Sequence, residues 1–172
     1  LTQFNLDSSQ VSYPLKVPVI DLFQWNSRDN SVLALVRIQG ILKFSEINLT
    51  SSEVNIINDK IVNWALKSES GELIYVDQMD RIWRQGPTED QVIDRLDGQA
   101  KNKQRFLLKG NVIYGISDDL NLWSYDLTTD AFDIIGQLPR NIDSLSDINQ
   151  QQLLIALRIS AKKEVAELIL KK

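Results

Sequence analysis

The sequence contains no cysteine and no histidine. Without cysteine, the chain cannot form a disulfide, a thiolate zinc site or a cysteine nucleophile. Without histidine, it lacks the commonest general base and the commonest transition-metal ligand, so a Ser/His/Asp triad is excluded. Chemistry based on carboxylates or lysine remains open. We therefore expect neither a bound metal nor a cofactor.

Long apolar runs and an excess of positive charge are also missing. No run approaches the ~20 apolar residues that are needed to cross a bilayer. The 19 basic and 23 acidic side chains give a net charge of −4, which disfavours binding to phosphate groups. Hydrophobic residues make up 43% of the chain, an ordinary value for a globular domain. We expect the 172 residues to form one folded domain that contacts neither nucleic acid nor a membrane through this segment.

Short apolar runs recur about every 40 residues, at Leu33-Ala-Leu-Val, Leu73-Ile-Tyr-Val, Val112-Ile-Tyr-Gly and Leu153-Leu-Ile-Ala. A second pattern has a similar period: an apolar residue, a four-residue polar turn and another apolar residue. It occurs at residues 6–11, 49–54 and 127–132. Short polar turns of this kind are typical of hairpins. Two independent patterns with one period indicate a repeat architecture.

The pattern within each repeat predicts four antiparallel strands, and four strands per repeat of about 40 residues is typical of a β-propeller blade. The fold class is therefore all-β, and the second repeat has strands expected at residues 61–66, 73–76, 81–84 and 91–96. The expected blades are 1–19 (partial), 20–59, 60–100, 101–138 and 139–172 (partial). A long meander or a sandwich is the alternative, but neither explains a fixed period.

The partial blades at both ends suggest that the chain is a piece of a longer protein. In one reading, the leading hairpin completes the last blade and closes a small ring. We favour the other reading, in which further blades precede Leu1. Open edge strands in such a piece would allow pairing with a second copy as a homodimer.

The segment Leu122-Trp-Ser-Tyr-Asp-Leu-Thr-Thr-Asp resembles the hairpin of TolB-like and WD-type propeller blades. Residues 110–116, 138–143 and 160–168 look like the C-terminal blades of CadC/ToxR-type membrane-anchored transcriptional regulators. This resemblance implies a periplasmic sensor joined by one transmembrane helix to a cytoplasmic winged-helix domain that binds DNA. It carries over no ligand residue.

The candidate binding residues lie in predicted loops. Asp118 and Asp119 follow the second strand of one repeat, as Gln78, Met79 and Asp80 do one repeat earlier. Paired carboxylates can bind Ca²⁺ or act as acid and base, but Asp also favours solvated turns, which is our preferred reading. Met79 would lie at a loop tip unless it fills a gap in the core, the commoner use of methionine. Lys101 and Lys103 complete the set, in a polar loop.

The four tryptophans are Trp25, Trp64, Trp83 and Trp123, and their spacing near 40 residues places them at equivalent blade positions. We therefore expect them in the core rather than in a sugar-binding site. The leading hypothesis is a non-enzymatic sensor domain that binds a protein partner or a small signal ligand on its loop face. The alternatives are a fragment of a carbohydrate-active propeller enzyme, with two facing carboxylates, and a cytoplasmic scaffold propeller.

Overall fold

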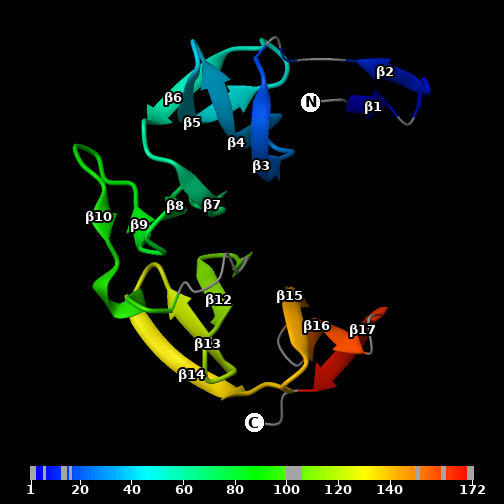
Figure 1. Cartoon of the computed structure of the whole chain (residues 1–172), viewed down its shortest axis with the longest axis vertical. Helices are drawn as coiled ribbons and strands as arrows, with labels where there is room; N and C mark the ends of the chain where they lie inside the picture. The colour runs from blue at the N-terminus through cyan, green and yellow to red at the C-terminus, as the bar shows by residue number, and fades with distance from the viewer. Residues whose placement is uncertain are drawn as a thin grey trace. The chain divides into compact units, whose positions relative to one another are not determined.

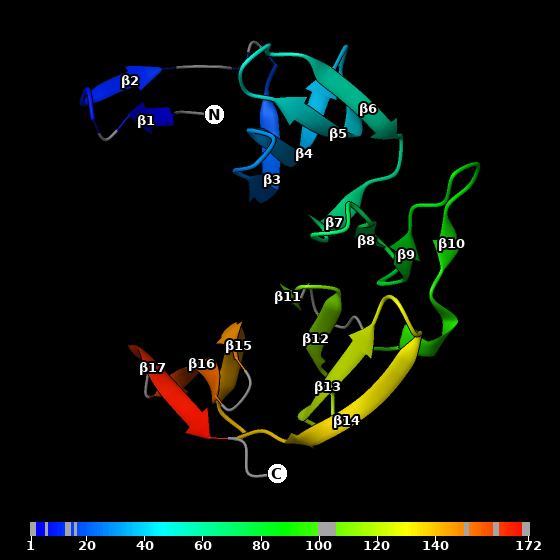
Figure 2. The ribbon, with the colours of Figure 1, turned by 180° about the vertical axis from the view of Figure 1, so that it is seen from behind.

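The computed structural model describes residues 3–5, 7–12, 15, 17–99, 106–149, 152–159 and 162–169. The described residues form five sheets in which neighbouring strands also follow one another in the chain (Figure 1 and Figure 2). A single short 3₁₀ helix interrupts them, and none of these residues belongs to a helix that is long and apolar enough to span a membrane. The predicted all-β class is confirmed.

Three of the sheets have four strands. The first of them contains β3 (Val19–Asn26), β4 (Ser31–Ile38), β5 (Ile41–Asn48) and β6 (Val54–Asn58). The next contains β7 (Val62–Lys67), β8 (Leu73–Asp77), β9 (Ile82–Arg84) and β10 (Gln91–Val92), and the third contains β11 (Leu107–Lys109), β12 (Val112–Ile116), β13 (Asn121–Asp126) and β14 (Ala131–Gln137).

The remaining sheets are smaller. β1 (Gln3–Asn5) pairs with β2 (Gln10–Ser12), and β15 (Ile142–Ile148), β16 (Gln152–Ile159) and β17 (Lys162–Ile169) form a three-stranded sheet. The sequence pattern predicts partial blades in these two parts of the chain. The chain divides into two compact units, residues 1–66 with 75–78 and residues 67–74 with 79–172.

The second strand of each repeat carries the apolar run that sets the period. In β4, the six residues from Ser31 to Val36 are all buried, and in β8 all five residues are buried. Because successive side chains of a strand point to opposite faces, a strand that is buried throughout is covered on both faces. β4 and β8 therefore form the core of their sheets.

Each unit has an apolar cluster of its own. In the first unit, Val32, Ala34, Val36 and Ile47 are buried against side chains that include Leu15 and Val19. In the second unit, the cluster joins the sheet β11–β14 to the sheet β15–β17. Its buried members are Ile116, Leu122, Leu138, Ile148, Leu153 and Ile155.

The turn between the third and fourth strands has the same backbone geometry in several repeats. Ser9, Ser52 and Asp130 occupy one position in it, with φ of 54°, 61° and 54°. Two of these turns also share a side-chain bond pattern: the Oδ1 atom of Asn48 accepts from the amides of residues 50 and 51, and that of Asp126 accepts from the amides of residues 128 and 129. The polar turns that recur in the sequence therefore also share one backbone conformation.

A β-bulge recurs at matching places in two fourth strands. The register of β6 on β5 shifts between Phe44 and Ser45, and the register of β14 on β13 shifts between Leu122 and Trp123. Ser45 and Trp123 are therefore structural equivalents. Their cross-strand partners are Ala34 and Gly115, respectively.

Trp25 does not lie in the core, contrary to the prediction from its spacing. Trp25 is 61% exposed, whereas Trp64 and Trp123 are buried and Trp83 is half-buried. β3 contains two register shifts against β4, and each extra residue changes which face the following side chains take. Phe23 packs on Phe44 at 6.1 Å instead.

The strand predicted over residues 91–96 is too long. Only Gln91–Val92 form β10, and Asp94–Leu96 form the 3₁₀ helix η1. The amide of Leu96 donates to the carbonyl of Ile93, and both side chains are buried. Burial at a spacing of three residues fits a helical turn, whereas a strand would bury every second residue.

Gly115 makes room for the indole of Trp123. A Cβ atom on Gly115 would lie 2.1 Å from Cζ2 of Trp123, which is fully buried and cannot move into solvent. We expect Gly115→Ala to lower the free energy of unfolding by about 1–3 kcal/mol, measured by urea denaturation. Gly136→Ala is the matched control, since nothing lies within 4 Å of a Cβ there. Equal losses in both variants would contradict the overpacking explanation.

Ser45 carries a fully buried hydroxyl with no hydrogen-bond partner among the described residues. Removing an unsatisfied buried hydroxyl removes its desolvation cost, so Ser45→Ala should raise the free energy of unfolding by about 1 kcal/mol. Ser31→Ala is the control, because the Ser31 hydroxyl donates to Oε1 of Glu46 at 3.0 Å, and its loss should cost about 1 kcal/mol. Destabilisation by Ser45→Ala would show that this hydroxyl does have a partner.

Candidate functional site

The predicted loop residues occupy hairpin turns. Gln78 and Met79 form the turn between β8 and β9, and Asp118 and Asp119 form the turn between β12 and β13. Asp80, with φ of 59°, is the left-handed residue of its turn, as Leu120 is forty residues later. The two turns are therefore structurally equivalent, but they belong to different sheets. Lys101 and Lys103 lie outside the described residues.

Asp118 and Asp119 fit the solvated-turn reading. Both are exposed, and the turn is closed by the amide of Leu120, which donates to the carbonyl of Ser117 at 2.9 Å. Over the described part of the chain, no group of three or more acidic residues is placed to hold a metal ion. Both residues therefore belong to an exposed hairpin turn that main-chain groups close.

Met79 is 76% exposed, so the commoner role of filling a core gap is wrong for this residue. It follows a strand whose five residues are all buried, and its neighbour Gln78 is exposed. A flexible apolar side chain is thereby exposed in the turn that follows a buried strand. Methionine in this position suits contact with a partner surface.

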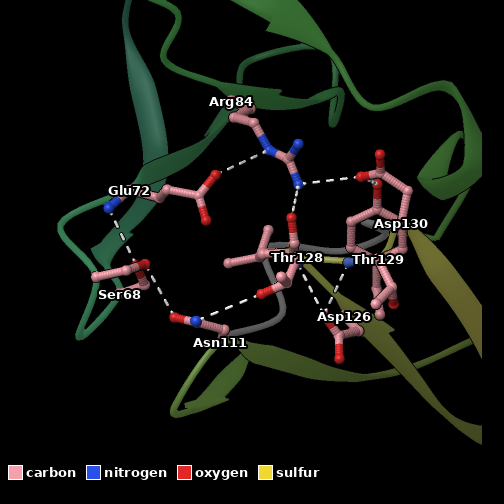
Figure 3. A network of polar contacts seen from close by, with 11 residues as sticks. Ser68, Glu72, Arg84, Asn111, Asp126, Thr128, Thr129 and Asp130 are labelled. Atoms are coloured by element: carbon pink, nitrogen blue, oxygen red, sulfur yellow. Dashed lines mark hydrogen bonds and ion pairs between the residues drawn. The ribbon is translucent and has the colours of Figure 1, made fainter.

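A polar network that the sequence did not reveal centres on Asp130 (Figure 3). Its Oδ1 atom accepts the Tyr125 hydroxyl proton at 2.6 Å and an N–H of Arg84 Nη2 at 3.2 Å. Its carbonyl oxygen accepts from Nη1 of Arg95 at 3.0 Å. One turn residue is thus bound by three side chains, from β13, β9 and η1.

Arg84 connects this turn to the neighbouring sheet. Its Nη2 atom also donates to the carbonyl of Leu127 at 2.8 Å, and its Nε atom lies 3.5 Å from Oε1 of Glu72. The side chain is 25% exposed, so these contacts are only partly screened by water. Arg84 is therefore held in one orientation between the two sheets.

A second chain of hydrogen bonds runs beside the first (Figure 3). Ser68 and Ser70 share a hydrogen bond of 2.8 Å, Ser70 donates to Oδ1 of Asn111 at 3.0 Å, and Nδ2 of Asn111 donates to the hydroxyl of Thr128 at 3.4 Å. The loop between β7 and β8 is therefore bonded to the same turn that Arg84 contacts. This arrangement fixes the turn over residues 126–130.

The proton of the Tyr125–Asp130 pair stays on the tyrosine. Burial, together with the hydrogen bond to Asp130, raises the pKa of Tyr125 to about 12. The hydrogen bond from Tyr125 and the charge of Arg84 lower the pKa of Asp130. Near neutral pH, the site therefore presents a neutral phenol, a carboxylate and two guanidinium groups.

A groove of about 340 Å³ opens beside this network. Its lining includes Arg84, Val92, Asp94, Arg95, Tyr125 and Asp130. Its volume lies near the lower limit for ligand sites, and it combines apolar, cationic and anionic groups.

A comparison of the repeats could have indicated this site. Asp130 and Ser52 take the same left-handed turn position, and Tyr125 corresponds to Ile47 on the strand before it. The turn therefore forms without a Tyr–Asp pair. Because the turn does not need Tyr125 and Asp130, these two side chains are candidates for another role.

No protein-family model and no curated protein sequence matches the chain. Solved structures do resemble it. TolB from Acinetobacter baumannii has a TM-score of 0.63 at 15% identity, over 96% of this chain and 45% of that one. An oligogalacturonate lyase in complex with manganese has a TM-score of 0.60 at 10% identity, over 99% of this chain and 54% of that one.

A third similar structure is the extracellular domain of a hybrid two-component system from B. thetaiotaomicron. Its TM-score is 0.57 at 11% identity, over 98% of this chain and 25% of that one. At such identities, the likeness shows the fold alone. The fold is a β-propeller type with four-stranded antiparallel blades, as predicted, and the chain spans 45% of the length of the TolB structure.

The Tyr125–Asp130 bond predicts a step in alkaline stability. Because folding raises the pKa of Tyr125 from about 10 to about 12, its contribution is complete below pH 10 and is lost as the pH rises through 12. We expect a tyrosinate absorbance step at 295 nm near pH 12 that disappears in Tyr125→Phe. The free energy of unfolding of this variant should also fall less between pH 10 and 12. Tyr114→Phe is the control, and persistence of the step in Tyr125→Phe would contradict the assignment.

Proposed function

We propose that this chain is a non-enzymatic sensor domain, the periplasmic C-terminal part of a membrane-anchored CadC/ToxR-like transcriptional regulator. The observation that carries the proposal is the display of Met79, 76% exposed, next to a wholly buried strand. A rigid support with an exposed apolar tip suits recognition of a protein partner. The fold shared with an extracellular domain of a two-component system supports an extracytoplasmic sensor role.

The proposed mechanism is a population shift. A partner or small signal binds the loop face at residues such as Gln78, Met79, Asp80 and Asp119, and the blades hold these loops in place. Binding changes how the anchored regulator associates, because one association state presents the loops better than the other. The DNA-binding step belongs to a separate winged-helix domain.

The first test is the sequence encoded upstream of Leu1. We expect a winged-helix domain followed by about 20 apolar residues. A catalytic domain in that position, or an N-terminal extension without a membrane-spanning segment, would contradict the proposed parent. An N-terminal extension without a membrane-spanning segment would favour the cytoplasmic scaffold.

A reporter assay on the full-length protein tests the loop face. We expect Met79→Ser to abolish signal-dependent transcription while leaving the amount of protein and its thermal melting unchanged, because the side chain is exposed. Ile134→Ser is the matched control, since Ile134 is also an exposed apolar residue, at 64%, but lies on the edge strand β14. Equal losses in both variants would count against a specific role for the hairpin.

An enzymatic role is the competing proposal, and the similar fold of an oligogalacturonate lyase is the reason to test it. The purified chain can be incubated with a panel of glycosides and oligogalacturonates. We expect no turnover. Turnover that is abolished by Asp80→Asn or Asp119→Asn would overturn the sensor proposal.

A further inference from the structure

The groove beside Asp130 contains unused hydrogen-bond donors on a fixed support. Nη2 of Arg84 donates to the carbonyl of Leu127 and to Oδ1 of Asp130, and Nε lies 3.5 Å from Oε1 of Glu72 without a hydrogen bond. Nη1 makes no hydrogen bond or ion pair within the described part of the chain. Arg95 is exposed and uses one N–H, donated to the carbonyl of Asp130. Two guanidinium groups therefore border one groove with donors to spare, and one of them is already oriented.

The groove also contains main-chain groups of an edge strand. β10 is the last strand of its sheet, and the amide of Ile93 donates to the carbonyl of Ile82. In an antiparallel ladder, hydrogen-bonded pairs alternate with non-bonded pairs, so Val92, opposite Trp83, is a non-bonded residue. The N–H and C=O groups of Val92 consequently point away from β9, where an added strand could bond to them.

The mixed charges of the groove favour an extended peptide over a small free anion. The groove is lined by the carboxylates of Asp94 and Asp130 as well as by the two arginines, so a small free anion meets repulsion along with attraction. An extended peptide can separate these contacts, because its main chain bonds to Val92 while one acidic side chain reaches the arginines. The half-buried Val92 and the buried Ile93 provide an apolar floor for its other side chains.

We propose that this groove binds an extended peptide segment, which pairs with the main chain of Val92 and places an acidic side chain against Arg95 and Nη1 of Arg84. The groove does not include the hairpin of Met79, so the inference is independent of the proposed regulator. It adds a second recognition surface to the chain.

The test uses two hexapeptide libraries that are randomised at five positions, with Glu at the fourth position in one and Gln in the other. Peptides retained by the immobilised 172-residue chain are quantified by mass spectrometry. We expect about fivefold more of the Glu library, since a partly exposed charge-assisted contact contributes this much. A third library, N-methylated on either side of the Glu residue, should lose the retention, because strand pairing needs the main-chain N–H groups.

Variants assign the binding to the groove. Arg95→Gln should reduce the Glu/Gln ratio to about one, and Arg140→Gln, which changes an exposed arginine outside the groove lining, should leave it unchanged. Met79→Ser should also leave it unchanged, which separates this site from the loop face. Equal retention of the two libraries, no retention of either, or equal effects of Arg95→Gln and Arg140→Gln would overturn the proposal.

Discussion

The architecture depends on strands that are buried on both faces. All side chains of β8 and the first six of β4 are removed from water, so neither strand can belong to a sheet with a solvated face. Such a sheet must be covered twice, and a four-stranded antiparallel hairpin unit cannot cover itself. In the second unit, the cluster around Leu122 and Leu153 shows how this requirement is met, by packing the face of one sheet against the next. Within that unit, the stacking of one blade on the next follows from this requirement.

The sequence predicted those parts of the fold that repeat. Apolar runs near Leu33 and Leu73 became central strands, and the polar turns became turns with one shared left-handed residue. The prediction for Trp25 was wrong because two bulges in β3 changed the side-chain alternation, and bulges leave little trace in an apolar pattern. The end of β10 was missed because Ile93 and Leu96 read equally well as strand residues until their hydrogen bonds are seen.

The candidate site was harder to predict because it joins residues far apart in the sequence. Arg84 and Asp130 are 46 positions apart, and nothing in either local motif indicates that they bond. The hairpin positions of Gln78, Met79, Asp118 and Asp119 followed from the repeat alone, since turns are local. Local chemistry thus predicted the loops, while the Asp130 network depends on how adjacent sheets pack.

The equivalence of Ser45 and Trp123 has a consequence for how such repeats diverge. In one sheet a serine faces an alanine, and in another a tryptophan faces a glycine, yet the strands keep the same register and the same bulge. The tryptophan fits only because its cross-strand neighbour is a glycine, so a large side chain at this position requires a small one opposite it. Two blades can therefore differ in most residues and still keep the same strand pairing and the same bulge. A shared origin of such modules is then easier to detect from their main chains than from their sequences.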